Sequence, residues 1–340
     1  MIGLSGAKFR NCSIDIFRYF CAILVVIIHT HPLAEYGANI DYIVSQIITR
    51  IGVPFFFAVA GYFYTQKLEK KQKIFLSYIK KLLITYFLWS CVYLLVEFLS
   101  WGYGQLKGFI VTGTLNFLIN GSYYHFWFFP ALIISVCIVT LFYKLRLQKF
   151  LIPLAIILYT IGCIGCAYYE LGIKIPVLGT IYELSFFTVI RRIFLMGLPF
   201  FICGHCVGKI ENTAIKLSNS KLCIILAVSI FVWLAEIFLV VKAGWQQNII
   251  ITFGLFLLVI SVMLFLLKNP LSKFRKLSEK CRIIANFTYY SHPLVMLIIK
   301  AIHEETPKLT MFVVTIAVTA VIGLILSKIH KNKIVAIITG

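Results

Sequence analysis

Long apolar runs, separated by short polar and basic segments, dominate the chain. Because a helix needs about 20 residues to cross a bilayer, and because backbone groups cannot remain unpaired in lipid, each long run predicts a membrane helix. Ten such runs are present: 14–31, 42–65, 79–100, 125–143, 150–169, 191–208, 221–241, 246–267, 283–302 and 309–328. We therefore predict an all-α polytopic protein with about ten transmembrane helices, in which residues 1–340 form a single membrane domain.

Composition supports the same class of protein. Hydrophobic residues make up 61% of the chain and charged residues 13%, about half the share that is usual in soluble domains. The mean hydropathy is +0.96. These values exclude an ordinary soluble enzyme and a disordered chain. We expect a multi-pass protein of the cell membrane, most simply a bacterial plasma membrane, whose surroundings are the lipid bilayer.

The net charge of +20 would suggest nucleic acid in a soluble protein, but here it has another explanation. Most basic residues lie in alternate segments between apolar runs, which is the pattern of the positive-inside rule. With the N-terminus inside, the outer segments hold only Lys107, Lys174, Arg191, Arg192, Lys242, Lys300 and Lys308. The pattern predicts cytosolic N- and C-termini and no nucleic-acid partner.

The first apolar run holds three ionisable residues: Asp15, Arg18 and His29. Arg18 and His29 are separated by three helical turns plus roughly 20°, so they share a face about 16 Å apart along the axis. Asp15 lies one turn before Arg18 and can pair with it. Ionisable groups inside a span usually face a cavity, and we expect Arg18 and His29 to share one water-filled tunnel.

This pair has two interpretations. Arg18 can hold an anionic donor while His29, whose pKa lies near neutrality, takes a proton from a hydroxyl. Alternatively, the two side chains reach the inner and outer membrane interfaces without any chemistry. The spacing alone does not separate these alternatives.

The second run contains Arg50 followed by Gly52, Pro54 and Gly61. Proline frees a backbone carbonyl, and glycines allow close approach of helices. The pattern predicts a bent helix beside a cavity, with packing as the default role of the glycines.

Further polar residues lie in later runs. His125 beside Trp127 can bind a polar acceptor or belong to an interfacial aromatic belt. Arg191 stands on the outer side against the charge asymmetry, and His292 lies within the ninth run. No pair of histidines has convincing ligand spacing, so we predict no metal site.

These residues together resemble the signature of the acyltransferase 3 family of membrane acyltransferases. The similarity lies in Arg18 and His29 with ten residues between them, and continues in the segments 53–62, 125–132, 191–204 and 292–293, which span nearly the whole chain. Within the family, segments 54–57 and 124–133 are most similar to the membrane half of the vancomycin-resistance serine racemases.

The family resemblance implies a cell-envelope enzyme that transfers acyl groups other than aminoacyl groups. The expected reaction moves an acyl group, most simply acetyl, from cytosolic acyl-CoA to a hydroxyl of an acceptor such as a glycan. His29 is the expected general base, and Arg18 positions the donor. Acyl-CoA is a substrate, and no tightly bound cofactor is expected. The residues implied to bind substrate are Asp15, Arg50, His125, Trp127, Arg191 and His292. The residues implied to attract donor phosphates are Lys67, Lys70, Lys71 and Lys73.

The racemase-like resemblance implies a different function. A membrane module of that type would carry L-serine across the membrane, without acyl transfer, to a racemase domain that follows Gly340 in the natural chain. Arg50 or Arg191 would then bind the serine carboxylate.

Overall fold

The computed structural model describes residues 11–70, 74–101, 116–214, 216–330 and 332–339. Within these ranges all regular elements are helical. The first half contains α1 (Cys12–Thr30), α2 (Ala38–Asp41), η1 (Tyr42–Ile47), η2 (Ile48–Ile51), α3 (Gly52–Lys70), α4 (Ile74–Trp101), η4 (Asn116–Asn120), α6 (Phe128–Lys144), η5 (Gln148–Phe150) and α7 (Leu151–Ile164). The second half contains α8 (Tyr169–Gly172), α9 (Pro176–Glu183), α10 (Phe187–Ile190), η6 (Arg191–Gly197), α11 (Leu198–Ala214), α12 (Asn219–Lys242), α13 (Phe253–Lys268), η7 (Ser272–Phe274), α14 (Arg275–Ile302), α15 (Lys308–Lys328) and α16 (Lys333–Ile338).

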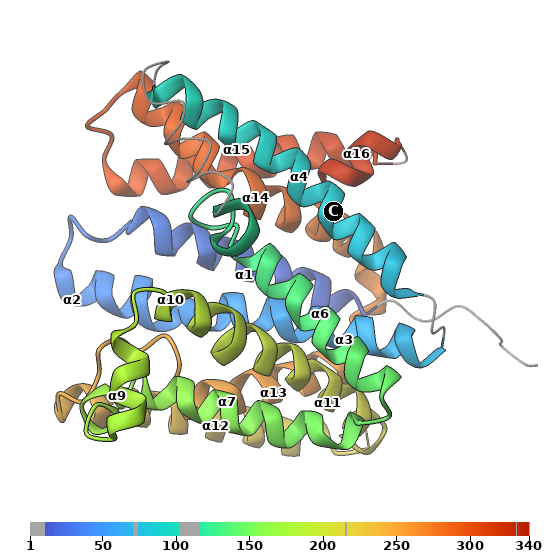
Figure 1. The fold of residues 1–340 in the computed structure, drawn as a ribbon. Coiled ribbons are helices and arrows are strands. Elements are labelled where there is room, and N and C mark those ends of the chain that lie inside the picture. Colours follow the sequence, from blue (N-terminus) through green and yellow to red (C-terminus); the bar gives the residue numbers. More distant parts are fainter. Residues whose placement is uncertain (1–10, 71–73, 102–115, 215, 331, 340) are drawn as a thin grey trace, which may run out of the picture.

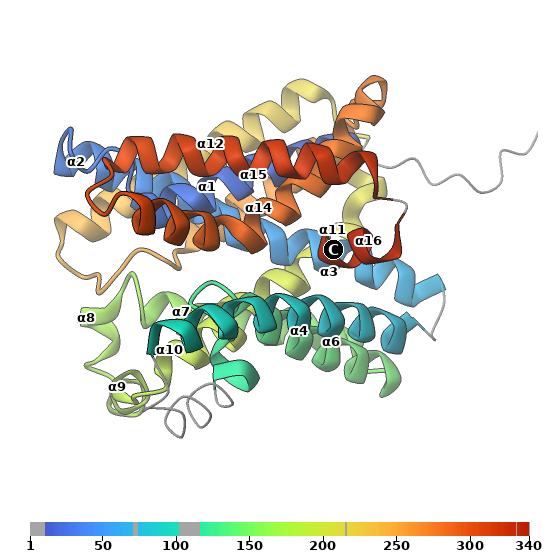
Figure 2. The same cartoon turned by 90° about the horizontal axis from the view of Figure 1, so that it is seen from above.

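The helices form a bundle around α1 and α3 (Figure 1). Helices α14, α15 and α4 lie on one side of this pair, and α7, α11, α12 and α13 lie on the other. The most extensive packing joins α3 to α11, α1 to α14, α14 to α15, and α12 to α13. The short C-terminal α16 lies against α4 (Figure 2).

The number of helices that are long enough to span a bilayer is smaller than the sequence predicts. Among the described residues six helices qualify, or seven spans if α13 and the helical segment Ser272–Ile302, which are bent by 85°, count as one. The apolar helices Phe128–Lys144 and Gln148–Ile164 are each shorter. A helix of 17 residues is about 25 Å long, less than the ~30 Å hydrocarbon core. Ten spans are therefore not confirmed, and the cytosolic termini stay a prediction.

The interface between α3 and α11 is unusually close. A Cβ atom on Gly61 would lie 1.9 Å from the Phe201 carbonyl oxygen, and one on Gly204 would lie 1.8 Å from that of Ala58. The two glycines thus bring the helix backbones into direct contact, as the glycine pattern of the second run indicates. Pro54 lies in the first turn of α3, directly after the 3-10 turn η2 (Ile48–Ile51), where the helix changes its hydrogen-bonding pattern.

Glu236 stabilises the start of α13. Its carboxylate accepts hydrogen bonds from the backbone N–H groups of Phe253 (2.8 Å) and Gly254 (2.5 Å) and from the Tyr168 hydroxyl (3.0 Å). The first N–H groups of a helix have no partner within the helix, and they carry a partial positive charge. This intramembrane acid therefore has a structural role.

Candidate functional site

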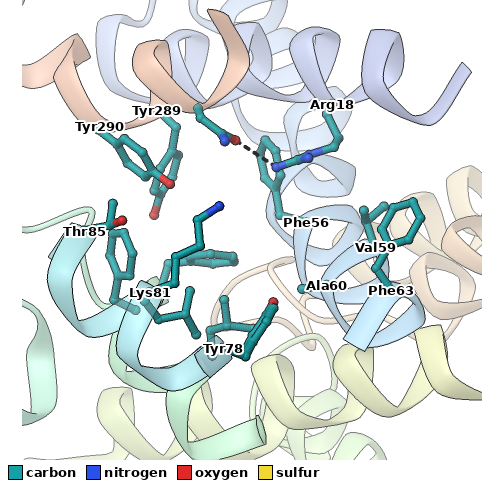
Figure 3. Close-up of a pocket in the computed structure, with 15 residues that line it drawn as sticks. Arg18, Phe56, Val59, Ala60, Phe63, Tyr78, Lys81, Thr85, Tyr289 and Tyr290 are labelled. Carbon is teal, nitrogen blue, oxygen red and sulfur yellow. Dashed lines mark hydrogen bonds between the residues drawn. The ribbon is translucent and has the colours of Figure 1, made fainter. Parts of the chain in front are cut away.

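Two cavities lie along the inner faces of α1 and α3. The Arg18 cavity has a volume of about 200 Å³ and is lined by residues of α1, α3, α4, α6 and α14 (Figure 3). The His29 cavity has a volume of about 270 Å³ and is lined by residues of α1, η2, α3 and η6, by the turn before α6 and by Ile250. Within the part of the chain that the structure describes, no residue lines both cavities.

Arg18 forms a polar network in the first cavity. Its Nη2 donates a hydrogen bond to Asn286 Oδ1 (2.8 Å), and its Nη1 lies 3.9 Å from the Asp15 carboxylate. Asn286 in turn donates to the backbone carbonyl of Thr339 (2.8 Å). Lys81 extends into the same cavity from α4 (Figure 3). The pairing of Asp15 with Arg18 is the one that the helical spacing predicts.

The end of the bundle beside the Arg18 cavity is strongly basic. Lys67 and Arg282 are both close enough to Lys81 to interact with it electrostatically. Lys67 and Lys70 are exposed near the end of α3, whereas the predicted phosphate-attracting residues Lys71 and Lys73 lie outside the described residues. This concentration of positive charge would attract an anionic ligand to the mouth of the cavity.

The C-terminal segment covers part of this end. The Thr85 hydroxyl donates to the carbonyl of Ile337 (3.3 Å), and Trp89 Nε1 donates to that of Ile338 (3.0 Å). Together with the bond from Asn286 to Thr339, these contacts fix α16 between α4 and α14. Asn286 therefore links the C-terminal segment to the Arg18 guanidinium.

His29 lies on the wall of the second cavity, in contact with other rings. Its ring centroid is 4.8 Å from that of Tyr124 and 5.3 Å from that of His292, which is stacked against it. His292 Nδ1 lies 3.0 Å from the carbonyl oxygens of Thr288 and Tyr289, which fixes its orientation. Among the described residues, no hydrogen bond occupies the His29 ring nitrogens. His29 can therefore accept a proton from a ligand in the cavity.

Three arginines share this cavity with His29. Arg50 comes from the 3-10 turn η2, and Arg191 and Arg192 come from the π-helix η6. Non-α turns of this kind change the direction of side chains and often mark functional sites. The Arg192 guanidinium lies over the Trp127 ring, 5.4 Å from its centroid.

Three aromatic rings that contact one another line the Arg18 cavity, and we call them the aromatic partition. Phe56, Phe128 and Tyr289 line the Arg18 cavity, and their ring centroids lie 5.6–6.3 Å from one another. Their chain neighbours Pro54 and Trp127 line the His29 cavity. The two cavities do not form the single tunnel expected from the sequence, because none of the described residues lines both of them.

The partition leads to a testable expectation. With acyl-CoA as the donor that the family resemblance implies, Phe128→Ala should join the cavities and raise hydrolysis of acetyl-CoA in the absence of acceptor, because water could then reach a donor bound beside Arg18. Thiol release from acetyl-CoA by protein in nanodiscs measures this. Phe63→Ala is the matched control, since Phe63 lines the same cavity outside the partition. Equal hydrolysis by the two variants would contradict a separating role.

The structure gathers some of the predicted site residues and separates others. His29, Arg50, Trp127 and Arg191 line one cavity, and Arg18 lines the other. His125, which is only 3% exposed, packs against His292 behind His29, with ring centroids 5.1 Å apart, and neither residue lines these cavities.

The cavities also contain residues that the sequence analysis did not name as site residues. These are Lys81, Tyr124, Arg192 and Asn286. The sequence does point to Arg192, because it follows Arg191 in a predicted outer segment, where basic residues are few.

Comparison with known proteins identifies the family. A family model described as an acyltransferase domain matches residues 11–329. The chain belongs to the acyltransferase 3 family. Members of this family are membrane acyltransferases in general, and the apolar helices of this member fit a multi-pass membrane protein.

The family relatives include much longer proteins. An amino-acid racemase of Enterococcus faecalis is 28% identical over 336 residues, which cover 96% of this chain and 46% of the racemase. A serine/alanine racemase of Enterococcus gallinarum is 35% identical over 178 residues, or 49% of this chain and 25% of that protein. The chain thus spans less than half the length of the curated relatives it matches. No solved structure matches the chain.

Proposed function

We propose that the chain transfers an acyl group, most simply acetyl, from cytosolic acyl-CoA to a hydroxyl group of an acceptor. The observation that supports this best is the position of His29, a base with free ring nitrogens, on a cavity wall beside three arginines. The separate cavity around Arg18 gives the donor a binding site of its own.

The Arg18 cavity suits an acyl-CoA arm. Its charged groups, Arg18 and Lys81, can bind polar groups of the donor, while aromatic walls accommodate the less polar acyl end. The basic mouth would attract the CoA phosphates from solution. Asn286 holds Arg18 in position through its 2.8 Å hydrogen bond, so it acts as a positioning residue.

The reaction then follows ordinary acyl-transfer chemistry. His29 takes the proton of the acceptor hydroxyl, and the oxygen attacks the thioester carbonyl carbon. The oxyanion that forms is stabilised by a neighbouring guanidinium, which the arginine cluster of this cavity can supply. The C–S bond breaks, the new ester forms, and the proton passes from His29 to the departing CoA thiolate. Rearrangement of the partition rings must bring the thioester to His29.

The donor side is tested with purified protein in nanodiscs and acetyl-CoA labelled in the acetyl group, with cell-envelope material as the acceptor. Transfer of label into an alkali-labile ester supports the proposal. Arg18→Gln should raise the KM for acetyl-CoA by roughly tenfold or more, the scale of one charge-assisted hydrogen bond. Arg275→Gln, on the exposed start of α14, is the control. Absence of both acetyl-CoA binding and ester formation would overturn the proposal.

The names of the relatives favour a second candidate. Because nearly the whole chain aligns with part of a protein named an amino-acid racemase, the domain could carry serine across the membrane instead. Saturable uptake of labelled L-serine into proteoliposomes, without any acetyl-CoA binding, would establish this function and exclude the first.

A further inference from the structure

The His29 cavity holds an unusual concentration of like charge. Arg50 and Arg191 are close enough to repel each other, and so are Arg191 and Arg192. All three are partly buried. Gathering three cations within a membrane domain is costly unless negative charge compensates them.

The described residues supply no such compensation. Within them, none of the three guanidinium groups lies within 4.0 Å of a carboxylate. Arg50 donates instead to the backbone carbonyl of Gln46 (2.8 Å) and to its side-chain oxygen. Arg191 interacts with the Cys166 thiol, and Arg192 lies over Trp127. Among the described residues, none that lines the cavity is an Asp or a Glu.

From this arrangement we propose that the His29 cavity binds the acidic part of an anionic acceptor, a carboxylate or phosphate group whose neighbouring hydroxyl lies at His29. The inference deepens the proposed function and rests on it for the identity of the ligand as an acyl acceptor. Guanidinium groups bind both kinds of acid through paired hydrogen bonds. The volume of about 270 Å³ is near the lower limit of ligand pockets, so it suits one acidic unit of a larger molecule.

The same charges disfavour a zwitterion. An amino acid such as serine carries an ammonium group, which would need an acidic or aromatic partner. No acid lines the cavity among the described residues, Arg192 covers the Trp127 face, and the Tyr124 ring packs against His29. A ligand with net negative charge therefore fits the cavity better than a free amino acid.

Matched probe pairs test this directly by binding to nanodisc-embedded protein, without any acyl donor. The pairs are 4-nitrophenyl β-D-glucuronide with the corresponding glucoside, and sn-glycerol 3-phosphate with glycerol; L-serine is the zwitterionic probe. We expect at least one acid to bind at least tenfold more tightly than its neutral partner and than serine, on the scale of a charge-assisted contact. Comparing the two acids tells which group is preferred. Equal affinity within both pairs, or tighter binding of serine, would overturn the inference.

Variants locate the site. Arg50→Gln, Arg191→Gln and Arg192→Gln should each weaken binding of the preferred acid by about tenfold, and Arg191→Lys, which keeps the charge, should weaken it less. Lys174→Gln removes an exposed cation between α8 and α9 and should change nothing. Unchanged binding in all three glutamine variants would contradict the assignment. If acids bind as described but no acyl group is ever transferred, the proposed function fails while the anion site stands.

Discussion

His29→Gln should reduce acyl transfer by about 10²–10⁴-fold, the usual contribution of a general base. Glutamine keeps a polar side chain of similar length but cannot take the proton from the acceptor hydroxyl. Binding of acetyl-CoA should be unchanged, because none of the described residues lines both the proposed donor cavity around Arg18 and the cavity around His29. Formation of labelled ester and equilibrium binding of acetyl-CoA, measured on the same nanodisc preparation, give the two readouts.

His303→Gln is the matched control for this experiment. His303 is exposed after the end of α14, away from both cavities, so its replacement should leave transfer intact. Transfer by His29→Gln at the rate of His303→Gln would show that His29 is not the base. A parallel loss of transfer and acetyl-CoA binding would show instead that the substitution disrupts the domain.

The largest effect on stability is expected at the contact between α3 and α11. Gly61→Ala should lower the free energy of unfolding by about 1–3 kcal/mol or more, the range of overpacked interiors. The upper part of that range is expected, because the new methyl group meets the backbone at Phe201, which cannot rotate away. Gly204→Ala should behave in the same way through its contact with Ala58. Thermal unfolding of the purified protein in detergent measures both.

Gly208→Ala is the control, because Gly208 lies on α11, one turn after Gly204. A Cβ atom there would lie 3.6 Å from the nearest atom, on the Tyr62 side chain, which is an ordinary contact. Its unfolding temperature should stay close to that of the wild type, or rise slightly because alanine favours helix. Equal unfolding temperatures for Gly61→Ala and Gly208→Ala would show that the close packing of α3 and α11 is not required.

The helical nature of the chain follows from its sequence, but the number of full spans does not. The apolar runs at 125–143 and 150–169 do contain helices. These helices, Phe128–Lys144 and Gln148–Ile164, are only 17 residues long each. Hydrophobicity does not reveal where a helix begins. At Tyr123–Trp127, for example, turns place His125 and Trp127 before α6 starts.

Contacts within a single helix of the candidate site could be predicted from the sequence, whereas contacts between several helices could not. Helical spacing predicts that Asp15 pairs with Arg18, and the two groups lie 3.9 Å apart, because this pairing follows from the geometry of a single helix. The partition could not be predicted, since Phe56, Phe128 and Tyr289 come from three helices far apart in sequence. The same holds for the arginine cluster, whose members come from η2 and η6, and for Asn286, which reaches Arg18 from α14.

We propose that donor and acceptor reach one reaction from two cavities, with the donor entering from the cytosolic side. The most direct measurement compares inside-out and right-side-out membrane vesicles that contain the protein, each supplied externally with labelled acetyl-CoA. We expect alkali-labile ester label only in inside-out vesicles, where the cytosolic face meets the donor, and its loss in His29→Gln. Equal labelling from both faces, or labelling that persists in His29→Gln, would contradict the claim.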